Sequence, residues 1–150
     1  MSLLENKKAT FNYEILDKYE AGLELLGQEV KSLRLGHGSL SGSYVTIRKG
    51  EMFLVGATIP PFQPKNAPDG YDDKGDRRLL VKKRELKYLI GKTDERGLTL
   101  IPLSVYNKGR FIKLSFALAK GKKKHDKRST IKEREDRRHI DRLKHQRRGL

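Results

Sequence analysis

The chain has 150 residues, enough for one domain, and its 34 Lys and Arg against 19 Asp and Glu give a formal net charge of +15. So basic a chain needs a polyanionic partner, with nucleic acid the first candidate and membrane headgroups the second. Cysteine is absent, which excludes disulfides and thiolate metal sites. Because no apolar run approaches the ~20 residues of a membrane helix and residues 1–9 lack a secretory signal, we expect a cytoplasmic protein.

Residues 11–25 carry apolar side chains mostly at odd positions, and this period of two predicts one long strand or a strand with a bend. Leu26, Val30 and Leu33 then recur at helical spacing, which predicts a short helix that ends at Gly36. A helix this short is marginal alone, so we expect it to pack on the sheet.

The stretches 44–47 and 52–55 flank a turn that contains Gly50, and they predict a hairpin in which this glycine has a positive φ. Residues 60–76 follow with four of the five prolines. So long a stretch without a predicted helix or strand is either functional or loosely held.

Residues 79–81 are predicted as a short strand, followed by a helix closed by Gly91. A second hairpin is predicted over residues 98–106 and 112–118, with a shift of apolar phase beside Pro102 that a bulge or edge position would produce. About six strands with two or three short helices predict a mainly β fold, an OB-like closed antiparallel barrel in residues 1–119, since closure removes exposed sheet edges.

Residues 120–150 form a basic tail with 14 Lys and Arg against 5 Asp and Glu. The tail has too few apolar residues to bury, so we expect it to be disordered when free. Thr130 and Glu133 nevertheless fit a capping box, which predicts that the tail becomes helical against an anionic partner. The alternative is a solvated tail that only aids solubility.

No catalytic or metal-binding motif is present in the sequence. The four histidines fit no metal-ligand pattern, and there is no P-loop, GxGxxG or GxSxG. Glu20, Glu24 and Glu29 could act as paired carboxylates, but acidic residues that alternate along a strand more often form its solvent-exposed side. We therefore expect no enzyme activity, no metal and no cofactor.

Basic residues outside the tail gather in three clusters, which we predict to contact phosphate. The clusters and their neighbours are Asn6, Lys7 and Lys8; Lys31 and Arg34; and Arg77, Arg78, Lys82, Lys83 and Arg84. Most Tyr and Phe residues are at core-like positions, and Tyr71 is the best candidate for base stacking. A folded RNA recognised by shape, phosphates and 2′-hydroxyls therefore fits better than a single strand. Glu20 could accept a hydrogen bond from such a hydroxyl or from a base edge.

Several motifs, in order along nearly the whole chain, resemble one family, SmpB. The first three begin at Asn6, Glu20 and Gly27 and read NKKA, EAGL and GQEVKSLR, and the middle ones read SYV, RLL and KREL. The last, AKGKK with HDKR and IKER, begins at Ala119 and is similar to the family's C-terminal signature. Two positions depart from the pattern: Gln28, where many members carry an aromatic residue, and Lys82.

The resemblance implies a protein that binds the tRNA-like domain of tmRNA and delivers it to stalled ribosomes in trans-translation. The tail would become helical in the empty mRNA channel and stand in for the missing codon–anticodon pairing. The implied tmRNA contacts are Asn6, Lys7, Glu20, Gly22, Lys31, Ser32, Arg34 and Leu80. The implied ribosome contacts are Lys122, Lys123, His125, Asp126, Lys127 and Arg128, to which we add the tail residues Lys124, Lys132, Arg134, Arg137 and Arg138 on charge. Elongation factor Tu, in a complex with charged tmRNA, is a further candidate partner, and we expect a monomer.

Two other functions stay open from the sequence. A ribosomal protein or general RNA chaperone would share the design of a barrel with a basic tail. A basic nuclease would share the charge, but the sequence lacks a catalytic set for it.

Overall fold

The computed structural model describes residues 2–95 and 97–122. The elements are β1 (Ser2–Glu5), α1 (Ala9–Asn12), β2 (Tyr13–Leu23), α2 (Gly27–Arg34), β3 (Tyr44–Arg48), β4 (Glu51–Val55), a 3-10 turn (Pro64–Asn66), β5 (Arg77–Leu80), α3 (Lys83–Thr93), β6 (Leu98–Lys108) and β7 (Phe111–Gly121). Of the tail, only residues 120–122 are described, so its predicted disorder and helix lie outside the described residues.

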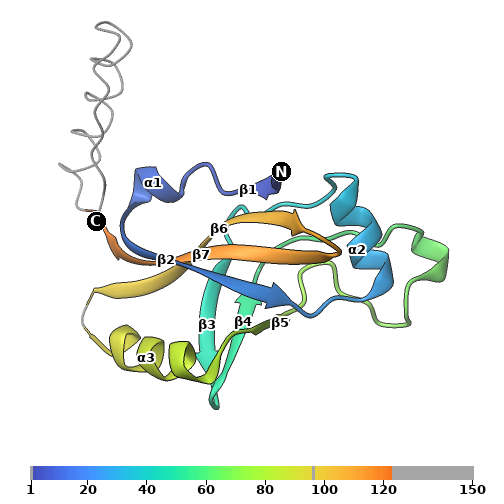
Figure 1. The fold of residues 1–150 in the computed structure, drawn as a ribbon. Helices are drawn as coiled ribbons and strands as arrows, with labels where there is room; N and C mark the ends of the chain where they lie inside the picture. The colour runs from blue at the N-terminus through green and yellow to red at the C-terminus, as the bar shows by residue number, and fades with distance from the viewer. Residues whose placement is uncertain (1, 96, 123–150) are drawn as a thin grey trace, which may run out of the picture.

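Six of the strands close into an antiparallel ring (Figure 1). The order is β6-β3-β4-β5-β2-β7, and β7 pairs back with β6. Strands β3 and β1 pair with different parts of β6, β3 at Leu100 and β1 at residues 104–106. The predicted mainly β fold and its closed antiparallel sheet are therefore confirmed.

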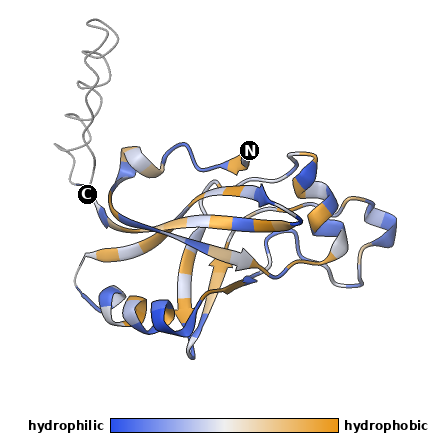
Figure 2. Ribbon diagram, viewed as in Figure 1, coloured by the Kyte–Doolittle hydropathy of each residue, from blue (hydrophilic) through white to orange (hydrophobic). Residues whose placement is uncertain are grey.

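The alternation of side chains along β7 builds the core. Every second residue faces the inside of the ring and is buried: Ile112, Leu114, Phe116 and Leu118. On the outer side, Ala117 and Ala119 are also buried, because they form a second cluster with Ala9 of α1 and Ile101 of β6. Figure 2 shows the resulting pattern, with many hydrophobic positions along the strands, while hydrophilic and hydrophobic positions alternate along α3.

Both predicted hairpins are present, with the bulge beside Pro102. In the β3–β4 turn both Lys49 and Gly50 have positive φ, at 50° and 74°. Two such residues in succession make a type I′ turn, whose twist matches that of the strands it joins. The helix expected after residue 25 is α2.

Several element boundaries differ from the sequence predictions, and one strand was missed. Phe11 lies in α1 rather than at the start of the long strand, because this short helix covers the small residues of β7. Gly91 lies inside α3 and does not end it, since an interior glycine costs only about 1 kcal/mol. Strand β7 extends to Gly121, past the predicted domain boundary at residue 119, by pairing with Tyr13. Strand β1 was not predicted.

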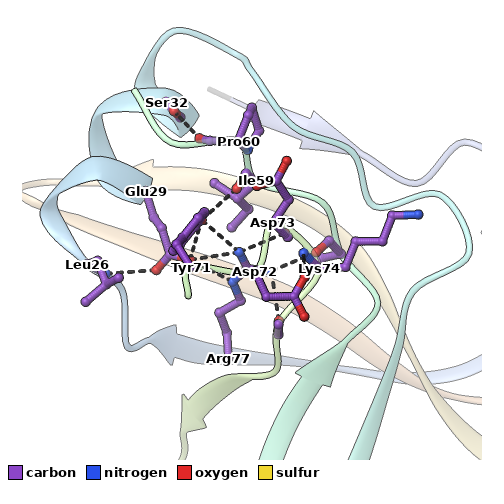
Figure 3. A network of polar contacts seen from close by, with 12 residues as sticks. Leu26, Glu29, Ser32, Ile59, Pro60, Tyr71, Asp72, Asp73, Lys74 and Arg77 are labelled. Atoms are coloured by element: carbon purple, nitrogen blue, oxygen red, sulfur yellow. Dashed lines mark hydrogen bonds and ion pairs between the residues drawn. The ribbon is translucent and has the colours of Figure 1, made fainter. Parts of the chain in front are cut away.

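A buried ion pair holds α2 against β5 and the Pro/Gly segment 60–76 (Figure 3). The Arg77 Nη2 and Glu29 Oε2 atoms lie 2.8 Å apart, and the two side chains are only 3% and 6% exposed. The Arg77 guanidinium also donates to the carbonyls of Ala57, Asp73 and Gly75, so it is fully engaged. The other Glu29 oxygen accepts from the Leu26 backbone N–H at 2.9 Å and caps α2.

Tyr71 belongs to the same network. Its hydroxyl lies 3.0 Å from Glu29 and 2.6 Å from the Ile59 carbonyl. Burial and the Glu29 hydrogen bond raise the pKa of Tyr71 to about 12. Tyr71 is therefore not free for stacking, and the segment 60–76 is closely tied to the ring.

Replacing Arg77 by Met should lower the free energy of unfolding by about 3–5 kcal/mol, because Glu29 would stay buried without its partner. The matched control is Arg78→Met at the next residue, whose ion pair with Glu51 is 45% and 47% exposed. Loss of that exposed pair should cost under about 1 kcal/mol. Urea denaturation monitored by circular dichroism measures both, and equal losses would contradict the assigned role of the buried pair.

Candidate nucleic-acid interface

A row of outward-facing positions crosses four strands of the ring. Leu80 on β5 pairs with Gly22 on β2, Gly22 with Lys113 on β7, and Lys113 with Tyr106 on β6. Directly paired residues of antiparallel strands point to the same face, so these positions share one surface. We call this surface, with Glu20, Lys108 and Phe111 at its edges, the outer face.

Gly22 has no side chain, so nothing projects from the sheet at this position in the middle of the outer face. A Cβ added there would lie 3.5 Å from the Leu80 Cβ, which is an ordinary contact, so packing does not require glycine. Its effect is to leave the sheet backbone open between Leu80, which is 49% exposed, and Lys113. A ligand can therefore approach the backbone closely at this point.

Glu20 presents an ionised acceptor on the outer face. The Tyr106 hydroxyl donates to one carboxylate oxygen, and the Lys108 ammonium lies 3.0 Å from the other. These two hydrogen bonds lower the pKa of Glu20 below its ordinary value, and the bond from Tyr106 has the larger effect. Burial and the same bond raise the pKa of Tyr106 to about 12, so its hydroxyl remains a donor at neutral pH. The unused lone pairs of Glu20 can accept hydrogen bonds from RNA hydroxyl or amino groups.

The structure brings Glu20, Gly22 and Leu80, three of the sequence-predicted RNA contacts, onto this single surface. The N-terminal cluster borders it on the β6 side, where the Asn6 amide donates to the Pro102 carbonyl at 2.9 Å. Lys7 and Lys8 follow directly and are exposed.

The remaining basic clusters lie around the same strands. Arg34, at the end of α2, donates to the Arg110 carbonyl in the β6–β7 turn at 2.9 Å. The Lys31 ammonium lies 5.7 Å from the Phe62 ring. Lys82, Lys83 and Arg84 are exposed at the start of α3, directly after β5. Arg78 is exposed and paired with Glu51.

Two predicted RNA contacts must be corrected. The Arg77 guanidinium is buried and fully bonded within the protein, and the Ser32 hydroxyl is buried and donates to the Pro60 carbonyl at 2.5 Å. Both side chains therefore serve the fold. Glu29 was expected on the solvent-exposed side of a strand, but it lies buried on α2.

Gln28, at the position that departs from the family pattern, accepts a hydrogen bond from the Gln63 backbone N–H at 2.7 Å.

Sequence reasoning missed four residues of the outer face: Tyr106, Lys108, Phe111 and Lys113. The alternation along residues 112–118 already put Lys113 on the outer side of its strand. The contacts of Tyr106 and Lys108 with Glu20 depend on strand register between residues more than 80 positions apart. That register is not visible in local periodicity.

The first residue of the predicted ribosome-binding set is anchored on α1. The Lys122 backbone N–H donates to the Asn12 carbonyl at 3.0 Å, and its ammonium donates to the Thr10 carbonyl at 2.7 Å. The chain therefore leaves the ring beside α1 (Figure 1). The other members of that set lie outside the described residues.

The structure describes residues 2–95 and 97–122 of the chain. In this part of the chain, no group of three or more His, Asp or Glu side chains is arranged to hold a metal ion. None of its helices has the length and apolarity needed to cross a bilayer.

Comparison with known proteins gives one consistent family. The family model described as SmpB protein matches residues 3–146. An SsrA-binding protein of Thermosynechococcus vestitus is 46% identical over 145 residues, which cover 97% of this chain and 95% of its own length. An SsrA-binding protein of Syntrophobacter fumaroxidans is 49% identical over 147 residues, 97% of this chain and 90% of its own.

A solved structure gives the same result. A chain from the structure described as "tmRNA-SmpB: a journey to the center of the bacterial ribosome" is 41% identical, with a TM-score of 0.65. The match covers 93% of this chain and 97% of that chain. This likeness therefore extends over almost the whole of both chains.

Replacing Tyr106 by Phe should raise the pKa of Glu20 toward its ordinary value, because the largest stabilising hydrogen bond to the carboxylate is lost. Lys108→Met should also raise the pKa of Glu20, because it removes the second hydrogen bond and a nearby positive charge. Carboxyl ¹³C NMR titration of the two variants and the unaltered protein measures the pKa directly. An unchanged pKa in the Tyr106 variant would show that this contact does not hold the carboxylate.

Proposed function

Because this chain belongs to the SmpB family, we propose that it is an RNA-binding adaptor that binds the tRNA-like domain of tmRNA and delivers it to stalled ribosomes for trans-translation. The observation that carries the proposal is the gathering of Glu20, Gly22 and Leu80 on the outer face, across the paired strands β2 and β5. The proposal is for a binding role without catalysis.

The two RNA partners use different parts of the chain in this proposal. The ring and its basic borders bind tmRNA, and the tail from Lys122 onward occupies the empty mRNA channel and the decoding region of the ribosome. The anchoring of Lys122 on α1 supports this division, since it fixes where the tail begins. The protein acts as a monomer in the cytoplasm and shares charged tmRNA with elongation factor Tu.

The competing function is a general RNA chaperone or a ribosomal protein that holds phosphate by charge alone. The Glu20 carboxylate argues against it. A surface that only attracts phosphate gains nothing from an acidic group among its cations, whereas a surface that reads a hydroxyl or base edge needs an acceptor.

Glu20→Ala should weaken binding to the tRNA-like domain about 10- to 100-fold, the effect of losing one hydrogen bond to a charged group. The matched control is Asp94→Ala, which makes the same charge change at the exposed end of α3. Control binding should be unchanged or slightly tighter. Fluorescence anisotropy with labelled RNA measures both, and tighter binding by the Glu20 variant would favour a general phosphate binder.

Removing residues 123–150 should leave the affinity for tmRNA within about tenfold, the part lost being non-specific charge attraction. The same truncation should abolish tagging of peptides from ribosomes stalled on an mRNA without a stop codon. The truncation leaves Lys122 and its anchor on α1 in place. A full-length chain with residues 123–150 in scrambled order serves as a control, because it keeps the charge. Loss of tmRNA binding on truncation would contradict the proposed division of roles.

A further inference from the structure

We propose that Phe111 is a stacking site for one unpaired base of the bound RNA, at the hairpin end of the outer face. The inference rests on the proposed function and adds a contact that uses neither charge nor a hydrogen bond. It assigns a role to an aromatic side chain that the sequence reasoning left out.

The exposure of Phe111 has no explanation in the core. Its side chain belongs to neither buried cluster, and at 67% it is the most exposed large hydrophobic residue among positions 2–95 and 97–122. Outward positions further along β7 are covered by α1, whereas Phe111 at the hairpin end is exposed. An aromatic ring left open on a binding surface is a common platform for a nucleic-acid base.

The backbone that carries the Phe111 side chain is held by strand pairing and by a contact from α2. Phe111 is the first residue of β7 and pairs directly with Lys108, the last residue of β6. The Arg34 guanidinium on α2 bonds to the Arg110 carbonyl at 2.9 Å and so braces the turn between them. A stacking ring needs this kind of support, because a mobile ring would lose more entropy on binding.

The positive charges around the Phe111 aromatic ring favour a nucleotide as the group that stacks on it. The Lys113 ammonium lies 5.9 Å from the ring centroid, and Lys108 and Arg110 are exposed beside it. A flat apolar surface bordered by cations matches a base with its phosphate. Lys108 also contacts Glu20, so the stacked nucleotide would lie next to the acceptor on the outer face.

The other exposed aromatic residues are less suited to this role. Phe62 is only 38% exposed, and Tyr88 lies on α3 beside Lys92, which is already paired with Glu95 at 3.2 Å. Tyr44 is 49% exposed at the start of β3, a strand that takes no part in the outer face. Tyr44 therefore provides a control for loss of an exposed aromatic ring.

The test compares Phe111→Ala, Phe111→Tyr and Tyr44→Ala in the full-length chain, with the tRNA-like domain of tmRNA as the probe. Affinity is measured at several salt concentrations. Phe111→Ala should weaken binding about 5- to 100-fold, while Phe111→Tyr and Tyr44→Ala stay within about twofold. The salt dependence of Phe111→Ala should be unchanged, because no cation is removed, whereas Lys113→Met should reduce it.

Chemical probing of the bound RNA gives the second readout. A nucleotide protected by the unaltered protein and by Phe111→Tyr should become reactive with Phe111→Ala, while protection elsewhere persists. Because Phe111 is exposed, the variants should keep the same circular dichroism spectrum and melting temperature.

The outcomes separate the inference from the function on which it rests. If the unaltered protein prefers the tRNA-like domain over an unrelated RNA of equal length, but Phe111→Ala binds it equally well with the same protection pattern, the stacking site is overturned. If the unaltered protein shows no such preference, the proposed function itself fails.

Discussion

The pairing of β7 with β2 on one side and β6 on the other is the constraint on which both the core and the candidate interface depend. It closes the ring, so alternate residues of β7 must point either into the core or out of it. The outward residues near Gly121 are small alanines covered by α1, and those near the turn are Phe111 and Lys113, which remain accessible. One strand therefore supplies core residues, the residues on which α1 packs, and part of the proposed RNA surface.

The buried Arg77–Glu29 pair connects this surface to the rest of the ring. Burying two charges is costly, and the pair is tolerated because carbonyls, a tyrosine hydroxyl and a backbone N–H complete its hydrogen bonds. The pair fixes α2 relative to β5. The far end of α2 contacts the β6–β7 turn, where the Arg34 guanidinium donates to the Arg110 carbonyl.

Period-two patterns and glycine turns made both hairpins predictable from the sequence, and apolar residues at helical spacing made α2 predictable. The number of strands, together with the need to avoid exposed sheet edges, predicted the closed fold. The exceptions have physical causes. A charged residue gives no local sign that it is buried, which is why Arg77 and Glu29 were placed at the surface. Strand register depends on pairing between residues far apart in the sequence. The hydrogen bond between Tyr106 and Glu20 therefore could not be predicted from local patterns. Phe111 did leave a signal, since it is an aromatic residue at an outward position of its strand, where a polar one is expected.

The central claim is that this chain selects one shaped RNA, and the transcripts it holds in bacterial cells test that claim most directly. The full-length protein is crosslinked to RNA in living cells, purified under denaturing conditions, and its bound RNA is sequenced against total RNA. The account predicts strong enrichment of tmRNA over tRNAs and ribosomal RNA, with crosslinks concentrated in the tRNA-like domain. Recovery of RNAs in proportion to their abundance would contradict it.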